Sequence, residues 1–178
     1  MKKLKGLLVL LILVVLTGCS FGNSPKSKVE ALLMKYQTNS TDLKTELDDF
    51  LDSINAADDY KDEYRKVYER QYKDLKYKIK DEKIDGDKAT VTAEIEVYDY
   101  YKTEADATSY IASNPGEFND NGVYSVSKGL EYKIKAYNNT KDRVTYTIDF
   151  TLTKTDNKWT IDPLTDDELA KLHGTYVH

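Results

Sequence analysis

The spacing of hydrophobic residues changes along the chain, and each change predicts a different kind of element. An unbroken apolar run covers residues 7–15. From about residue 28 to residue 75, apolar residues recur every three or four positions, which is typical of amphipathic helices. Beyond that point apolar and polar residues alternate, which is typical of strands with one buried face. The chain is therefore expected to form helices first and a sheet afterwards.

Three helices are predicted before the first strand. The pair Ser24-Pro25 and a capping box formed by Ser27 and Glu30 indicate where the first helix starts. Residues 37–41 separate it from a second helix, and a third runs from about residue 57 to residue 72. The positions that form the apolar faces of these helices are Val29, Leu32, Leu33, Tyr36, Leu43, Leu47, Phe50, Leu51, Ile54, Tyr60, Tyr64, Val67, Tyr68, Tyr72 and Leu75.

Two hairpins are predicted in the second part of the chain. The first contains alternating residues 75–79 and 90–98 around a turn at 84–87, where Gly86 can adopt a positive φ. The second joins residues 144–153 to residues 158–161 through Asp156-Asn157. The positions expected to face the core are Val91, Ala93, Ile95, Val97, Val144, Tyr146, Ile148, Phe150 and Leu152.

Helical patterns also occur between the hairpins and after the second one. Thr103 is expected to cap a helix that continues to residue 113, and another helix ends near residue 139. A capping box of Thr165 and Glu168 opens a last helix, which closes at Gly174. Strands with one wet face favour an α+β fold, in which N-terminal helices pack on one face of a curved antiparallel sheet and helices are inserted between two hairpins.

The first nineteen residues combine three lysines, the apolar run, a small residue and the sole cysteine, Cys19. This order is typical of a secretory signal peptide. A helix of about ten apolar residues is roughly 15 Å long, half the hydrocarbon thickness of a bilayer, so a spanning helix is not expected. The stretch Leu16-Thr17-Gly18-Cys19 resembles the lipobox of bacterial lipoproteins.

The resemblance implies that Cys19 receives a diacylglyceryl thioether with fatty acyl (palmitate-type) chains and becomes the mature N-terminus. The protein would then be anchored on the extracytoplasmic face of the bacterial cell membrane. The expected organisation is a lipoprotein signal peptide at 1–18, a lipid-anchored tether at 19–27 and a single α+β domain at 28–178.

Several segments of the mature chain resemble small lipoproteins of uncharacterised function from Gram-positive bacteria. They are Tyr77–Asp87, Glu96–Tyr101, Arg143–Leu152, Trp159 and His173-Gly174. These motifs are structural, and the resemblance implies no activity. More loosely, helices before a curved antiparallel sheet resemble cystatin-like and nuclear transport factor 2-like domains, which implies a pocket between the sheet and the helices.

Charge limits the partners that the chain can have. It carries 26 basic and 31 acidic residues, and removal of the signal peptide takes away three lysines and no acid. The mature domain is therefore acidic, which argues against nucleic acid as a partner, since nucleic acid is a polyanion. The expected partners are the membrane, through the lipid on Cys19, and an envelope protein, peptide or glycan of unknown identity.

The candidate catalytic and metal-binding groups are few, so no cofactor, metal or catalytic residue is assigned. The cysteine is used for the lipid, and the two histidines are His173 and His178. His173 is expected to be a cation at a helix C-terminus, and the acidic residues Asp48, Asp49 and Asp52 a solvated helix face. A non-enzymatic binding domain is the leading hypothesis. The alternative is a small carboxylate-based enzyme with a cone-shaped pocket.

Two sets of residues are candidates for these hypotheses. Tyrosine is unusually frequent, with 15 tyrosines against 4 phenylalanines. Those of the third helix have core spacing, whereas Tyr98, Tyr100 and Tyr101 are predicted to form an exposed ligand-binding cluster at the end of a strand. For the enzyme alternative, Glu94 and Glu96 are the first pair to consider, because they lie two residues apart and share a strand face.

Overall fold

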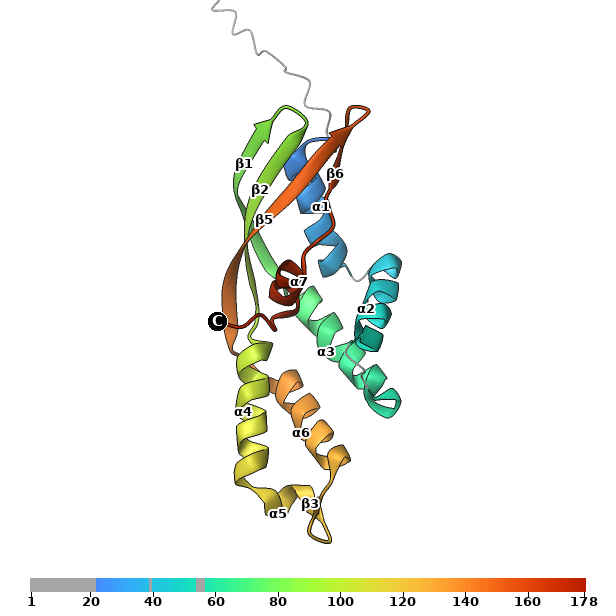
Figure 1. Ribbon diagram of the computed structural model, residues 1–178, viewed down its shortest axis with the longest axis vertical. Coiled ribbons are helices and arrows are strands. Elements are labelled where there is room, and N and C mark those ends of the chain that lie inside the picture. Colours follow the sequence, from blue (N-terminus) through green and yellow to red (C-terminus); the bar gives the residue numbers. More distant parts are fainter. Residues whose placement is uncertain (1–21, 39, 54–56) are drawn as a thin grey trace, which may run out of the picture.

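The computed structural model describes residues 22–38, 40–53 and 57–178 (Figure 1). Cys19, the signal peptide and the first part of the predicted tether lie outside these residues, as does Ile54. The described residues form seven α-helices and a four-stranded antiparallel sheet, with a small two-stranded ribbon besides. The predicted α+β class, with helices inserted between two hairpins, is confirmed.

The three predicted N-terminal helices are present as α1 (Pro25–Gln37), α2 (Thr41–Ser53) and α3 (Lys61–Lys73), the last preceded by a short 3₁₀ turn, η1 (Asp58–Tyr60). The capping box of α1 lies one turn earlier than predicted. The Ser24 hydroxyl accepts the Ser27 amide at 3.1 Å, and the Ser27 hydroxyl accepts the Ser24 amide at 3.0 Å. Pro25 favours this earlier start, because its φ is already helical and it has no amide to satisfy.

The sheet has the order β1–β2–β5–β6, and all neighbouring strands are antiparallel. Its strands are β1 (Lys76–Asp85), β2 (Lys88–Tyr98), β5 (Arg143–Thr155) and β6 (Lys158–Ile161). In the central pair, Val91 lies opposite Phe150 and Ile95 lies opposite Tyr146. Val91, Ile95 and Phe150 are completely buried, so the predicted inward face of these strands is confirmed.

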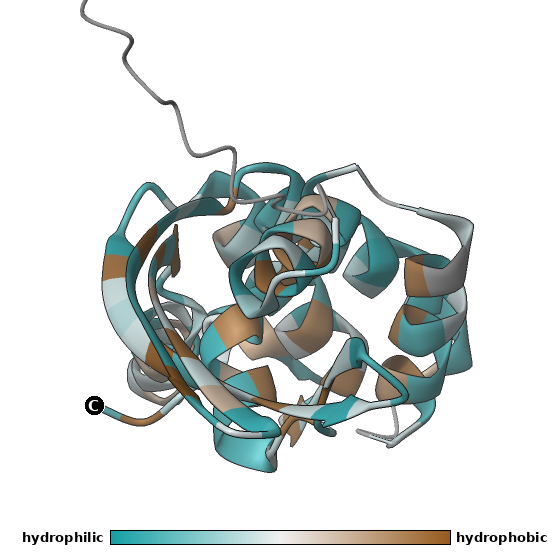
Figure 2. Ribbon diagram, turned by 90° about the horizontal axis from the view of Figure 1, so that it is seen from above, coloured by the Kyte–Doolittle hydropathy of each residue, from teal (hydrophilic) through white to brown (hydrophobic). Residues whose placement is uncertain are grey.

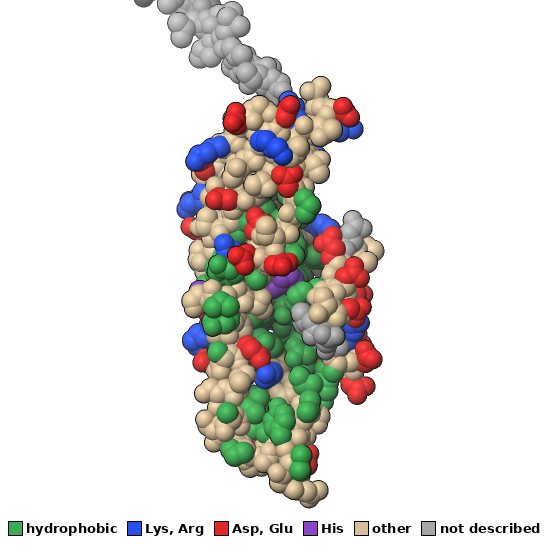
Figure 3. Space-filling model, in the orientation of Figure 1, with side chains coloured by type: hydrophobic (Ala, Val, Ile, Leu, Met, Phe, Trp, Pro, Cys, Tyr) green, Lys and Arg blue, Asp and Glu red, His purple; other side chains and the backbone are tan. Residues whose placement is uncertain are grey.

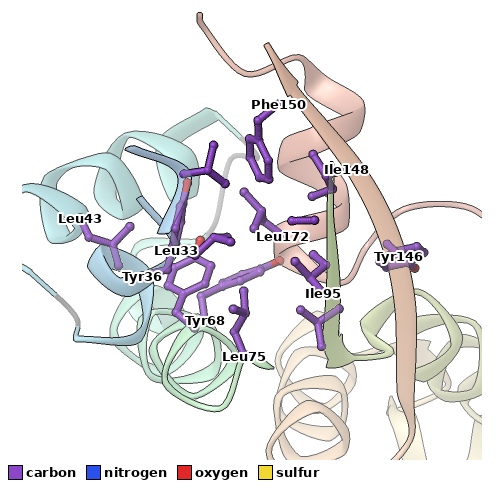
Figure 4. Close-up of a cluster of buried hydrophobic side chains, with 14 of the residues drawn as sticks. Leu33, Tyr36, Leu43, Tyr68, Leu75, Ile95, Tyr146, Ile148, Phe150 and Leu172 are labelled. Carbon is purple, nitrogen blue, oxygen red and sulfur yellow. The ribbon is translucent and has the colours of Figure 1, made fainter. Parts of the chain in front are cut away.

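Helices α1, α3 and α7 (Asp166–His173) cover the inner face of the sheet, and the strands curve around them (Figure 2). In the core, Leu172 of α7 lies among Ile148 and Phe150 of β5 and Leu33 of α1 (Figure 4). Tyr68 and Tyr72 of α3 are also buried, which confirms the core spacing of the α3 tyrosines. Thr145, Thr147 and Thr151 of β5 are exposed on the opposite face of the sheet.

Residues 100–139 form a helical arm that extends beyond the end of the sheet (Figure 1). Its elements are α4 (Tyr100–Ser113), α5 (Pro115–Phe118), β3 (Asn119–Asp120), β4 (Val123–Tyr124) and α6 (Val126–Asn139). The predicted cap at Thr103 is wrong. Asp99 caps α4 by accepting the Lys102 amide at 2.8 Å, and the Thr103 hydroxyl donates to the Asp99 carbonyl oxygen at 2.7 Å. Strand β2 therefore continues almost directly into α4.

The first described residues lie at the end of the molecule opposite the helical arm (Figure 1). The Asn23 side chain donates to the carbonyl oxygen of Asn157, in the β5–β6 turn, at 2.7 Å. The amide of Lys26 donates to the Glu82 carboxylate of β1 at 2.8 Å. Helix α1 begins at Pro25, so it includes residues 25–27 of the predicted tether. The start of the domain is thus held between the two hairpins.

Candidate ligand pocket

A pocket of about 590 Å³ lies between α1, α2, α7 and the segment that follows β6. Its apolar wall consists of Leu32, Leu43, Leu47, Ile161, Leu164 and Leu169. The amphipathic pattern of α2 places Leu43 and Leu47 four residues apart on one side of that helix. On the far wall, the capping box of Thr165 and Glu168 sets the start of α7, with the Thr165 hydroxyl accepting the Glu168 amide at 3.3 Å. The predicted second capping box is therefore confirmed.

The floor of the pocket contains a pair of neutral polar side chains. The Tyr72 hydroxyl lies 3.0 Å from Nδ1 of His173, and the Phe50 ring stacks on the imidazole at 4.1 Å between centroids. Burial lowers the pKa of His173 to about 4 and raises the pKa of Tyr72 well above its ordinary value. Near neutral pH both groups are uncharged, so the hydrogen bond joins a neutral phenol to a neutral imidazole.

His173 was expected to be a cation at a helix C-terminus, and the structure corrects its charge. It is 6% exposed, because the last turn of α7 packs on Tyr68 and Tyr72 of α3 and on Phe50 of α2. A cation there would lose its hydration without gaining a charged partner. The sequence contains a signal for this burial: His173 lies four residues after Leu169 and next to Leu172, on the apolar side of the last helix.

Gln71 fixes the position of this floor relative to the sheet. Its side-chain amide donates to the carbonyl oxygens of His173 at 2.8 Å and Tyr98 at 2.9 Å, and its carbonyl oxygen accepts the Tyr98 amide at 2.8 Å. Gln71 is completely buried. Gly174 has φ +73°, and a Cβ there would lie 2.1 Å from the Tyr98 carbonyl oxygen. The glycine therefore allows α7 to end against α3 and β2.

Acidic residues border the mouth of the pocket. They are Glu46 and Asp49 of α2 and Asp162 after β6, and the Lys35 ammonium pairs with Glu46. Asp162 accepts the Thr153 hydroxyl at 2.7 Å, and this hydrogen bond lowers the pKa of Asp162. Among the described residues that line the pocket, none is Lys or Arg. Figure 3 shows hydrophobic side chains around a histidine near the centre of this face, with acidic side chains over α2.

The three predicted ligand-binding tyrosines lie outside this pocket and have different surroundings. Tyr100 is completely buried, and its hydroxyl donates to the Val67 carbonyl oxygen at 3.0 Å. Tyr98 stacks on Tyr100, and the Arg70 guanidinium lies 3.7 Å from the centre of the Tyr98 ring. Tyr101 is 36% exposed. Because α4 begins at Tyr100, the side chains of Tyr100 and Tyr101 point in different directions around the helix. The binding role of the three tyrosines stays a prediction.

Glu94 and Glu96, the candidate carboxylate pair, lie on the wet face of β2. Each is paired with a lysine of β1: Lys80 lies 3.3 Å from Glu94, and Lys76 lies 2.9 Å from Glu96. The hydrogen bond from Lys76 lowers the pKa of Glu96, whereas a carboxyl that acts as a general acid needs a raised pKa. In the part of the chain that the structure describes, no three His, Asp or Glu side chains are grouped so that they could hold a metal.

Comparisons with known proteins give one likeness. No protein-family model and no curated protein matches the chain. Among solved structures, the chain is similar to a provisionally named lipoprotein (ycdA) from Bacillus subtilis, with 18% sequence identity and a TM-score of 0.41. The match covers 76% of this chain and 44% of that protein, so the chain spans less than half of its length. No helix among the described residues is long and apolar enough to cross a bilayer.

Proposed function

We propose that this protein is a membrane-anchored lipoprotein whose extracytoplasmic domain binds a small apolar ligand in the pocket between α1, α2 and α7. The anchor is supported by the pattern around Cys19. The observation that carries the binding role is the pocket itself, because ten of its fifteen described lining residues are apolar or aromatic. Its volume of about 590 Å³ lies within the range usual for small-molecule sites.

The polar groups of the pocket support binding rather than catalysis. A carboxylate-based enzyme needs ionised groups near the reacting atoms, with at least one carboxyl whose pKa is raised. Here the carboxylates border the mouth, and the floor carries the neutral Tyr72–His173 pair. The floor can orient one polar group of a ligand through a hydrogen bond. The enzyme alternative has no comparable observation in its favour among the described residues.

The orientation that follows from a lipid on Cys19 is also part of the proposal. Asn23 and Lys26 contact the hairpin end of the domain, so that end faces the membrane and the helical arm points away from it. The pocket is lined by residues of α1, α2 and α7, and these helices lie between the hairpin end and the tip of the helical arm (Figure 1). An envelope protein, peptide or glycan that approaches from outside would then meet the arm first.

The binding role is tested with straight-chain alcohols of increasing length. The full-length protein is held in lipid nanodiscs, and binding is followed through the methyl NMR signals of Leu164 and Leu169. Each added methylene that enters the pocket contributes about 0.8 kcal/mol, so affinity should rise about fourfold per methylene until the pocket is full. Empty nanodiscs correct for the alcohol that dissolves in the lipid.

A pocket-filling variant and a matched control make this test specific. Leu169→Trp introduces an indole at a residue that lines the pocket, and it should abolish the shifts of the Leu164 methyl signals, which remain in this variant. Val177→Trp introduces the same side chain at a residue that is 66% exposed and outside the pocket, and should leave binding unchanged. Equal binding by both variants would show that the alcohols bind elsewhere, and the proposal would be wrong.

A further inference from the structure

The charged residues of the pocket all have the same sign. Glu46, Asp49 and Asp162 are the charged side chains among the described lining residues. On α2, Glu46, Asp49 and Ser53 are spaced three and four residues apart, so they form one row along the helix. Phe50 lies next to this row and contacts the floor through His173. Glu46 and Asp49, the acidic row of α2, therefore border an apolar interior on the side of the mouth.

The three carboxylates differ in the partners that they already have. Glu46 pairs with Lys35, and Asp162 accepts the hydroxyl of Thr153. The Asp49 side chain has no ion pair or hydrogen bond within the described residues, and it is exposed. A carboxylate keeps acceptor capacity on both oxygens even when one hydrogen bond is made. Among the three, Asp49 therefore has the most hydrogen-bond acceptor capacity left for a ligand head group.

The floor of the pocket does not offset this negative charge. Burial lowers the pKa of His173 to about 4, so its imidazole is neutral near neutral pH. Tyr72 is neutral as well, since burial raises its pKa. An anionic head group would meet three carboxylates and no lining cation. A cationic head group would meet complementary charge at the mouth while its apolar body remained in the interior.

We infer that the ligand of this pocket is a cationic amphiphile, an alkylammonium-type molecule whose apolar body contacts Leu43, Leu47 and Leu164 and whose head group lies beside Asp49. This inference rests on the proposed function and adds the charge of the ligand to it. Association between the ammonium and Asp49 takes place at a partly solvated mouth. Its contribution to the binding free energy is therefore that of an exposed ion pair. The preference for a cation over an anion comes from the summed contributions of the acidic row.

The inference is tested with three molecules that have the same six-carbon chain: hexylamine, hexanol and hexanoate. Their binding to the full-length protein in nanodiscs is measured at neutral pH through the Leu164 and Leu169 methyl signals. Hexylamine should bind about fivefold tighter than hexanol, and hexanoate about fivefold weaker. The affinity for the neutral alcohol reports the apolar contacts of the pocket alone. Comparing the charged molecules with it separates the effect of charge from binding itself.

Variants of α2 assign the charge effect to its residues. Asp49→Asn should weaken hexylamine two- to fivefold and leave hexanol unchanged, and Asp49→Lys should reverse the preference so that hexanoate binds better than hexylamine. Asp52→Asn is the matched control, because Asp52 lies on the same helix, pairs with Lys61 and does not line the pocket. It should change none of the three affinities.

The possible results separate the two proposals. Binding of hexanol with equal or weaker binding of hexylamine would overturn the cationic ligand and leave the apolar pocket standing. Tighter hexylamine binding that persists in Asp49→Lys would overturn the role of the acidic row. If none of the three molecules shifts the pocket methyls, both the binding role and the inference about charge are wrong.

Discussion

The hydroxyl of Tyr72 lies 3.0 Å from Nδ1 of His173, and this contact joins two residues that are 101 positions apart in the chain. Tyr72 belongs to α3 and His173 to the last turn of α7. Phe50 of α2 stacks on the same imidazole. One buried histidine therefore connects three helices at the floor of the pocket.

Acid should destabilise the protein through His173. Burial lowers the pKa of His173 to about 4, whereas an unfolded histidine has a pKa near 6.5. The unfolded state therefore binds more protons between these values. The stabilising contribution is fully present above pH ~6.5 and is lost, at roughly 1.4 kcal/mol per pH unit, as the pH falls toward 4. Urea titrations at several pH values measure this slope.

A second histidine provides the control for this pH dependence. His173→Gln should remove the steep loss between pH ~6.5 and 4, while His178→Gln should keep it, because His178 takes no part in the buried contacts of His173 with Phe50 and Tyr72. If the two variants keep the same slope as the original protein, another group causes the acid sensitivity and burial does not lower the pKa of His173.

The inward face of β5 should be far more sensitive to substitution than its outward face. Phe150 is completely buried, and Phe150→Ala should cost roughly 3–5 kcal/mol of unfolding free energy because it leaves a cavity. Thr151 is exposed, and Thr151→Ala should change stability by at most about 0.5 kcal/mol. Similar midpoints for both variants in a denaturant titration would contradict the packing described for this strand.

The close approach at Gly174 should make this glycine hard to replace. A Cβ at Gly174 would lie 2.1 Å from the Tyr98 carbonyl oxygen and 2.2 Å from the Gln71 side-chain nitrogen. Gly86 also has a positive φ, but nothing lies within 4 Å of its Cβ position. Gly86→Ala should lower the free energy of unfolding only by the backbone strain of about 1–2 kcal/mol. Gly174→Ala should lower it by clearly more, because the added Cβ also clashes. The melting temperatures of the two variants measure this difference. Equal decreases in melting temperature would contradict the close approach of Gly174 to the Tyr98 carbonyl oxygen.

The lipid anchor is tested at Cys19. Cys19→Ala should remove the acyl chains and release the protein from membranes, since each buried methylene of an acyl chain contributes about 0.8 kcal/mol to membrane binding. Metabolic labelling with a fatty-acid analogue, followed by membrane fractionation, measures both effects. Absence of label on Cys19 in the original protein would rule out the lipoprotein assignment.

Local patterns predicted the elements of the fold well, because each pattern has one dominant physical cause. The alternation along β2 and β5 reflects one buried sheet face, and the structure has the same inward residues. The starts of α1 and α4 were misplaced, because several residues near each start can act as caps. Ser24 with Pro25 prevailed over Ser27, and Asp99 prevailed over Thr103.

The pocket could not be predicted from local patterns. Leu32, Leu47 and Leu164 line the same pocket but come from α1, α2 and the segment after β6. No local spacing in the chain predicts that these three segments come together. The burial of His173 could not be predicted from local patterns either. Its place at a helix end predicts a cation, but the rings of Phe50 and Tyr72 that bury it come from distant segments.

The most direct test of the binding role is a crystal structure of the protein with a bromine-tagged octanol. The anomalous signal of bromine locates the chain end of the alcohol without reference to any assumed site. We expect a bromine peak inside the pocket, between Leu43 of α2 and Leu164 after β6, and none there in the Leu169→Trp variant. A peak elsewhere on the protein, with the pocket empty, would contradict the binding role.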